Sequence, residues 1–295
     1  MKKLFSMVLT IAVILSLIAC GGGKTALRNT DVLEYSSKAG EEMELVPFEE
    51  ITVVDNAQCA IKITAIDPDN IWGYTLKAYF ENKSADKTYM FSVTGAAVNG
   101  VESDPFFATE VAAGKKAIDE ISFSDDLSSH RIGAFTDIEI SFRVYDSDDW
   151  FADAVAEETV HVYPYGEQNA TVFVREAQAT DTVVADNDNV SVIVTGYDED
   201  EFWGYTVYLY LVNKTDTELM YSVDNVSING FMADPFWAAS VGAGKAAFTT
   251  ISWFDSDLEE KGITAVEEIE MNFRIYESEN WFADDIFNEV ITLKP

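Results

Sequence analysis

Basic residues are scarce in this sequence of 295 residues. It holds 19 lysines and arginines against 52 aspartates and glutamates, a formal net charge of −33. A surface with this charge repels phosphate backbones and anionic lipid headgroups. We therefore expect no nucleic-acid partner and no electrostatic capture by a membrane. The acidity itself is typical of a well-dispersed, soluble surface.

Histidine is equally rare, and the motifs of several enzyme classes are missing. The two histidines are His130 and His161. The sequence has no Gly-x-Ser-x-Gly elbow, no glycine-rich phosphate loop and no His-Glu-x-x-His zinc pair. Carboxylates are so abundant that some pair would fall at a glycosidase-like separation by chance. The sequence therefore predicts a protein without catalytic activity, and an envelope enzyme is the third of three alternatives.

Only two cysteines occur, Cys20 and Cys59. If Cys20 is acylated, Cys59 has no partner within the chain, which excludes an intramolecular disulfide framework. Cys59 alternates with Ile61 and Ile63 in a strand-like pattern. We expect its side chain to be a small buried apolar group.

The amino terminus carries the one long apolar run. Lys2 and Lys3 precede an apolar stretch over 7–18, which ends in Leu-Ile-Ala-Cys at 17–20. This order is typical of a secretory signal peptide. Residues 4–19 number 16, short of the ~20 that a transmembrane helix needs. We predict a signal peptide over 1–19, lipid on Cys20 and a flexible tether over 20–44.

The remainder of the chain is written twice. Trp-Gly-Tyr-Thr occurs at 72–75 and again at 203–206, and Trp-Phe-Ala-Asp occurs at 150–153 and 281–284. Asn-Gly and Asp-Pro-Phe recur between these motifs, at an offset of 130 or 131 residues. A period this long indicates two homologous units rather than a solenoid. We place the first repeat at 45–164 and the second at 165–295.

Each repeat shows the two-residue period of half-buried β-strands. Alternation is clearest over 72–80 and 138–144, and over 203–211 and 269–275 in the second copy. It places Trp72 and Trp203 on the apolar, inward row. In the second copy, we expect Thr171 to Arg175 to extend the first strand region upstream. Asn-Gly and Asp-Pro pairs separate the strands, as hairpins and strand edges require. The predicted fold is all-β, with two tandem immunoglobulin-like β-sandwich domains.

The four residues at 17–20 resemble the lipobox of bacterial lipoproteins. Together with the strand spacing and the Asn-Gly and Asp-Pro-Phe turns over 45–295, they make the chain resemble Gram-positive surface lipoproteins with tandem immunoglobulin-like domains of unassigned function. The resemblance implies an extracytoplasmic protein anchored by lipid to the bacterial cell membrane. It supplies no catalytic residues.

Aromatic pairs are the first candidate site. Adjacent strand residues point to opposite faces, so one member of each pair should face solvent unless a loop folds both under. Such a ring either plugs an open end of the sandwich or forms a platform for a sugar or a protein. The candidate ligand-binding residues are Trp150, Phe151, Trp281, Phe282, Phe106, Phe107, Phe236 and Trp237.

Acidic turns are the second candidate site. Oxygen ligands at alternate positions around a turn suit calcium, although these turns lack the glycine and the closing glutamate of a calcium loop. Solvated turns are the favoured interpretation, and we expect no other cofactor. The candidate metal ligands are Asp146, Asp148, Asp149, Asp153, Glu277, Glu279 and Asp284.

These patterns favour a lipid-anchored, non-catalytic module for cell-surface binding or adhesion. The main alternative is a carbohydrate-binding protein of the envelope that uses exposed aromatic side chains. The expected partners are the membrane, through Cys20, and a surface protein or glycan.

The anchor is tested by Cys20→Ser. Without the thiol that accepts the diacylglyceryl group, the protein should remain unprocessed or leave the membrane fraction. Metabolic labelling with a radioactive fatty acid measures the lipid directly. Unchanged labelling of the variant would show that Cys20 is not the attachment point.

Overall fold

The computed structural model describes residues 43–123, 126–149, 151–199, 201–202, 204–280 and 282–295. The predicted signal peptide, Cys20, Trp150, Trp203 and Trp281 lie outside these residues. Within the described residues, none of the helices has the length and apolar character needed to span a membrane.

The first repeat forms nine strands and a short helix. They are β1 (Ile51–Asp55), β2 (Cys59–Asp67), β3 (Tyr74–Asn82), β4 (Tyr89–Val98), β5 (Val101–Ser103), β6 (Ala108–Val111), β7 (Lys116–Phe123), α1 (Asp126–Ser129), β8 (Ile138–Asp146) and β9 (Ala156–Val162).

These strands form two facing layers. One layer has the order β1-β2-β3-β7. In the other layer β4 pairs with β8, which pairs with β9, and β5 and β6 pair with different stretches of β4. This arrangement places β2, β3 and β7 where immunoglobulin-like sandwiches have strands A, B and E. It places β4, β8 and β9 where such sandwiches have C, F and G. The structure confirms the predicted all-β sandwich fold.

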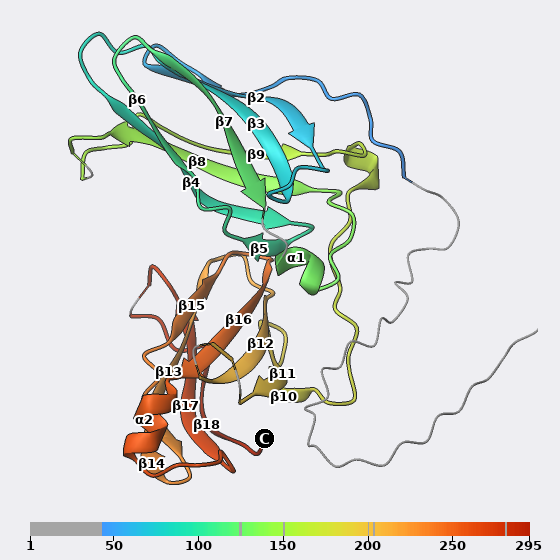
Figure 1. Ribbon diagram of the computed structural model, residues 1–295, viewed down its shortest axis with the longest axis vertical. Coiled ribbons are helices and arrows are strands. Elements are labelled where there is room, and N and C mark those ends of the chain that lie inside the picture. Colours follow the sequence, from blue (N-terminus) through green and yellow to red (C-terminus); the bar gives the residue numbers. More distant parts are fainter. Residues whose placement is uncertain (1–42, 124–125, 150, 200, 203, 281) are drawn as a thin grey trace, which may run out of the picture. The chain divides into compact units, whose positions relative to one another are not determined.

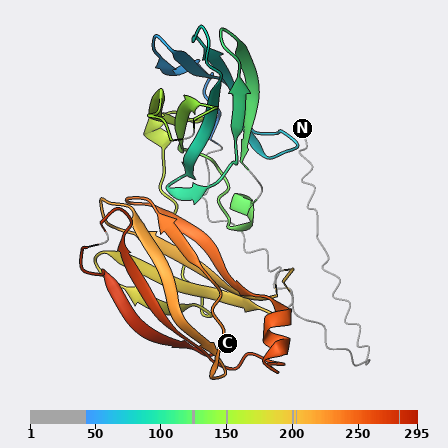
Figure 2. The same cartoon turned by 90° about the vertical axis from the view of Figure 1, so that its left-hand side faces the viewer.

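The second repeat follows the same order (Figure 1; Figure 2). A 3-10 turn (Glu167–Asn169) comes before its strands. The elements are β10 (Thr182–Asp186), β11 (Val190–Asp198), β12 (Tyr205–Asn213), β13 (Leu219–Ile228), β14 (Phe231–Met232), β15 (Ala238–Val241), β16 (Ala246–Trp253), α2 (Asp255–Glu260), β17 (Ile269–Glu277) and β18 (Phe287–Leu293). The proposed domain boundaries stay a prediction.

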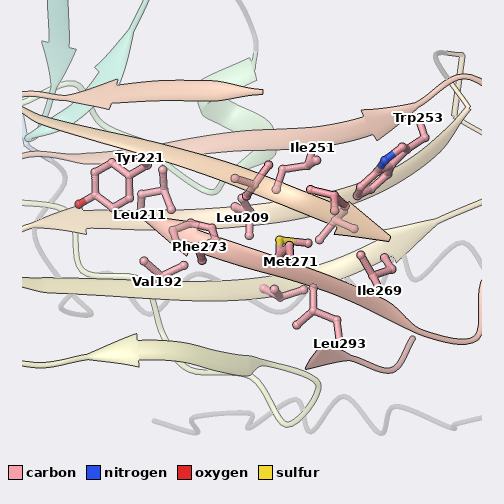
Figure 3. Packing of buried hydrophobic residues seen from close by; sticks show 14 of the residues in the cluster. Val192, Leu209, Leu211, Tyr221, Ile251, Trp253, Ile269, Met271, Phe273 and Leu293 are labelled. Carbon is pink, nitrogen blue, oxygen red and sulfur yellow. The ribbon is translucent and has the colours of Figure 1, made fainter. Parts of the chain in front are cut away.

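The alternating rows form the cores. Leu76, Ala78 and Phe80 are fully buried in β3, and Cys59 is buried beside them on β2. In the second repeat β12 and β17 bury the equivalent rows between the two layers (Figure 3). The inward rows that the two-residue period predicts, and the buried Cys59, are therefore confirmed.

Two expectations from the sequence are wrong. Trp72 is largely exposed, because β3 begins only at Tyr74 and Trp72 belongs to the preceding turn. Thr171 to Arg175 were expected to extend a strand, yet they lie in no strand. Their backbone is held instead by the first repeat, since the N–H of Phe173 donates to the carbonyl oxygen of Asn99 at 2.8 Å.

The Asn-Gly pairs form tight hairpins, as predicted. Asn99 and Gly100 have φ values of 52° and 77°, and Asn229 and Gly230 have 51° and 80°. Positive φ at both central positions matches the right-handed twist of the flanking strands.

A buried asparagine connects the two layers of each sandwich. The Asn82 amide, at the end of β3, donates to the carbonyl oxygens of Lys87 and Val111, both at 2.8 Å. Its own oxygen accepts from the N–H of Ser84 at 2.9 Å. Asn213 makes the equivalent bonds, donating to Thr217 and Val241 at 2.7 and 2.8 Å. The bonds to Val111 and Val241 satisfy carbonyl groups in the buried interior.

Replacing Asn82 by alanine should therefore destabilise the fold. The buried carbonyl group of Val111 loses its donor, and we expect a loss of about 1–3 kcal/mol, the cost of one unsatisfied buried group. Urea unfolding of the full chain measures the loss. Asn56 is the matched control, because its side-chain oxygen accepts from the N–H groups of Gln58 and Cys59 at an exposed turn. Equal losses for Asn82→Ala and Asn56→Ala would contradict the structural role of the buried amide.

Candidate binding site

The Asp-Pro-Phe turns have the same unusual geometry in both repeats. Asp104 Oδ1 accepts from the N–H of Phe106 at 3.0 Å, and Asp234 Oδ1 accepts from the N–H of Phe236 at 2.9 Å. These bonds hold both phenylalanines at positive φ, 29° and 50°. Positive φ is uncommon for a residue with a bulky side chain, and it costs conformational energy.

Burial does not repay this cost. Phe106 is 92% exposed and Phe236 is 99% exposed. A strained backbone that displays a large apolar side chain to water, in both copies, points to a role outside folding. These two side chains are the centre of the candidate site.

The next residue in each turn does the opposite. The Phe107 ring stacks on buried Phe80 with centroids 5.3 Å apart, and Trp237 lies 6.0 Å from the Phe273 ring. The carbonyl oxygen of Phe107 also accepts from the N–H of Val93 in β4 at 3.1 Å. Each pair therefore has one ring that packs on the core and one ring exposed to solvent, and the packed ring fixes the position of the exposed one.

The phenylalanine of each Trp-Phe loop is exposed. Phe151 follows β8, Phe282 follows β17, and both are almost entirely exposed. The N–H of Phe151 donates to Asp149 Oδ1 at 3.2 Å, so a side-chain oxygen again shapes the turn. Trp150 and Trp281 lie outside the described residues. The structure thus places four of the candidate aromatic residues at the surface: Phe106, Phe236, Phe151 and Phe282.

A third repeated position was not predicted. Ile71 and Phe202, which are 131 residues apart, are both largely exposed in the turns before β3 and β12. The sequence offers one signal for them, since each directly follows an acidic turn and precedes a Trp-Gly pair. Trp72 is exposed beside Ile71.

A groove of about 600 Å³ lies beside Phe106. Its aromatic lining comes from Phe106, Phe107 and Tyr145, and Thr94 and Gly95 of β4 also line it. The register of β4 against β8 shifts between Val93 and Gly95, which is a β-bulge. A β-carbon added to Gly95 would meet no heavy atom within 4 Å. The bulge and the missing side chain therefore keep the groove open.

Hydroxyl and carboxylate groups supply the polar lining. Ser92, Ser103, Glu102 and Asp104 line the groove, and its charged lining residues are all acidic. Glu102 Oε1 accepts from the N–H of Gly242 at 2.6 Å. Burial raises the pKa of the Glu102 carboxyl, with the backbone hydrogen bond acting in the opposite direction. Such a lining can accept hydrogen bonds from an uncharged ligand and repels an anion.

The second repeat has different residues at two of the lining positions. Asp224 and Asn225 stand where the first repeat has Thr94 and Gly95, and Asn225 has a φ of 52°. The two copies therefore share the exposed phenylalanine but differ in the surface beside it.

The acidic turns are organised by their own chain. Asp146 Oδ1 accepts from the N–H of Asp148 at 3.2 Å, and Asp146 Oδ2 pairs with Lys87 at 2.8 Å. Lys87 lowers the pKa of the Asp146 carboxyl. In the second copy, Glu277 Oε2 accepts from the Asn280 amide at 3.3 Å.

Among the described residues, no group of three or more histidine, cysteine, aspartate or glutamate side chains is arranged to hold a metal ion. The candidate ligands Asp149, Asp153, Glu279 and Asp284 are exposed in these turns. Solvated turns stay the prediction from the sequence, with calcium binding as the alternative.

No protein-family model matches the chain, and no curated protein is similar to it in sequence. Among solved structures it is similar to the exo-chitosanase CsxA of Amycolatopsis orientalis, with a TM-score of 0.22 and 11% identity over 75% of this chain. It is similar to red sea bream transglutaminase at a TM-score of 0.22 and 12% identity over 82% of this chain. The matched regions cover 25% and 31% of those two proteins. The fold class is that of an all-β sandwich protein.

The strain in the Asp-Pro-Phe turn is measurable. Phe106→Gly should leave the free energy of unfolding unchanged or raise it by up to about 1 kcal/mol, because glycine adopts positive φ without a steric penalty. Phe231 is the control, since it is also an exposed phenylalanine but lies in strand β14, outside the positive-φ region. Phe231→Gly should cost about 0.5–1 kcal/mol through the added freedom of the unfolded chain. Equal losses for the two variants in urea unfolding would show that the turn is unstrained.

Proposed function

We propose that this chain is an extracytoplasmic lipoprotein of the Gram-positive surface type, anchored through Cys20, that binds a surface ligand without catalysing a reaction. The lipobox-like sequence and the net charge of −33 support the anchor and the exposure to solvent. The two histidines support a non-catalytic role, since Lys261 and Thr292 replace them in the second copy.

One observation carries the binding function. Each repeat holds a phenylalanine at positive φ, fixed by an aspartate and almost fully exposed to water. A flat apolar ring at a rigid position loses little conformational entropy when it contacts a ligand. The same feature at Phe106 and Phe236 supports two binding positions on one chain.

The groove beside Phe106 favours a neutral glycan as the ligand. Its volume falls within the range of small-molecule sites, which is roughly 300–1,000 Å³. Aromatic rings can stack on the apolar face of a sugar, while the serine hydroxyls and carboxylates can bond its hydroxyl groups. The acidic lining disfavours an anionic glycan.

Two weak sites on one tether would act together. The second contact becomes intramolecular once the first has formed, so the effective ligand concentration at the second site rises. This advantage is greatest for a repetitive ligand such as a polysaccharide chain.

Affinity electrophoresis tests the proposal. The full chain is run through gels that contain a neutral β-glucan, mannan or xylan, and through gels that contain alginate as the anionic control. We expect retardation by at least one neutral polysaccharide and none by alginate. Phe106→Ala and Phe236→Ala should each weaken the retardation about tenfold, the loss expected for one stacked ring worth about 1–1.5 kcal/mol.

Gly95→Asn introduces the second repeat's residue into the groove and should weaken retardation without loss of stability, because the added β-carbon meets open space. Phe254→Ala, at a partly exposed phenylalanine outside the candidate residues, is the comparison variant and should leave the retardation unchanged. Retardation that survives the double replacement of Phe106 and Phe236 would move the site to another surface.

A further inference from the structure

The same hairpin is covered in one repeat and exposed in the other. Asn99 and Val101 of the first repeat are buried, with Val101 only 1% exposed. Their counterparts Asn229 and Phe231 are exposed, with Phe231 53% exposed. Met232, which follows, is 63% exposed. The second repeat therefore presents an apolar end that the first repeat keeps covered.

A second hairpin provides the cover in the first repeat. The turn between β15 and β16 lies against β5 (Figure 1). The N–H of Ala246 donates to the carbonyl oxygen of Gly100 at 2.9 Å, and the N–H of Gly242 donates to Glu102. Lys245 pairs with Glu139 of β8 at 2.8 Å. The contact shows that a hairpin of this fold can cover the Asn-Gly end of a sandwich.

The matching hairpin of the first repeat is exposed. Residues 112–118 correspond to 242–248, and Lys115, Lys116 and Ile118 are all exposed. At the equivalent positions Ala246 is buried, and Phe248 stacks on His130 at 3.8 Å. Strand β7 is also an edge of its sheet, while β16 pairs with β5 at Ala246.

The two exposed surfaces carry opposite charge. Lys115 and Lys116 are adjacent on the hairpin, in a chain that has only 19 basic residues. Glu267, Glu268 and Glu270 are exposed where β17 begins, next to the apolar end. Glu270 occupies the position of Glu139, and Lys115 occupies that of Lys245, so a contact between them would repeat an ion pair already present within the chain.

The ion pairs that these two surfaces make within the chain are exposed and weak. Lys116 pairs with Glu81 at 3.3 Å and keeps 60% of its side chain exposed. Glu268 pairs with Lys294 at 3.3 Å and keeps 47% exposed. Exposed pairs of this kind are worth little and exchange readily.

We propose that a second copy of this chain docks its 112–116 hairpin onto the end formed by Phe231, Met232 and the glutamates at 267–270. The contact is heterologous, because the two faces are different surfaces of the molecule. Each copy would keep one face free, so further copies can add. Anchoring to one membrane would raise the local concentration and favour this association. The proposal does not depend on the ligand of the exposed phenylalanines.

Charge reversal tests the proposal on the full chain in a mild, density-matched detergent. Sedimentation equilibrium over a rising protein concentration should show self-association that weakens as salt is added. The hairpin variant, Lys115→Glu with Lys116→Glu, should be monomeric. The acceptor variant, Glu268→Lys with Glu270→Lys, should also be monomeric. A mixture of the two variants should associate again, because each then meets a face of opposite charge.

Control variants reverse the same number of charges elsewhere. Lys62→Glu with Lys214→Glu, and Glu158→Lys with Glu289→Lys, should associate like the unchanged chain. Near-ultraviolet circular dichroism confirms that each variant is folded, and recovery in the mixture shows that neither variant had simply lost its structure. An unchanged chain that stays monomeric at every concentration would overturn the proposal. Association that the reversals leave intact, or that the mixture does not restore, would overturn it too.

Discussion

Each sandwich depends on a buried asparagine amide that connects its two layers. The two hydrogens of the Asn82 amide bond carbonyl oxygens of different segments, and the carbonyl of Val111 is the last one in β6. Strand β6 begins just after the turn that holds Phe106 and Phe107. The amide therefore fixes one end of β6, while the stacking of Phe107 on Phe80 fixes the other. Between them they position a turn whose exposed ring has no anchoring contact of its own in the core.

The two repeats place this turn in different surroundings. The positive φ and the aspartate hydrogen bond recur in both copies, and an aromatic residue that packs on the core follows, Phe107 in one and Trp237 in the other. The surface beside the ring differs, because Gly95 leaves space where the second copy has Asn225. The ends of the sandwiches differ as well, since Glu102 accepts a hydrogen bond from the other repeat while Met232 is exposed. One fold thus carries a shared exposed phenylalanine and copy-specific surfaces.

Much of the fold could be predicted from the two-residue period. Rows such as Leu76, Ala78 and Phe80 show one apolar face, and burial of that face follows directly from the hydrophobic effect. The period could not show that β3 begins only at Tyr74, so Trp72 was placed in the core although it belongs to the preceding turn. Thr171 to Arg175 resemble a strand in composition. The N–H of Phe173 nevertheless donates to the carbonyl oxygen of Asn99, a partner distant in sequence that composition does not reveal.

The candidate site could be predicted only in part. The sequence identifies the aromatic pairs, and the two-faced nature of a strand implies that one ring of each is exposed. Which ring is exposed depends on the Asp104 hydrogen bond and the positive φ of Phe106, which are local features of the turn. The groove depends on a shift of register between β4 and β8, and the alternation of β4 alone does not show it.

The central claim is that the exposed ring at position 106 contacts the ligand. Incorporating 4-fluorophenylalanine at this position places one fluorine reporter on the ring. We predict that its fluorine NMR resonance shifts, and that the shift saturates, as fragments of a retained neutral polysaccharide are added, while alginate fragments leave it in place. A resonance that stays unchanged while the polysaccharide still retards the protein would show that the ring at position 106 does not contact the ligand.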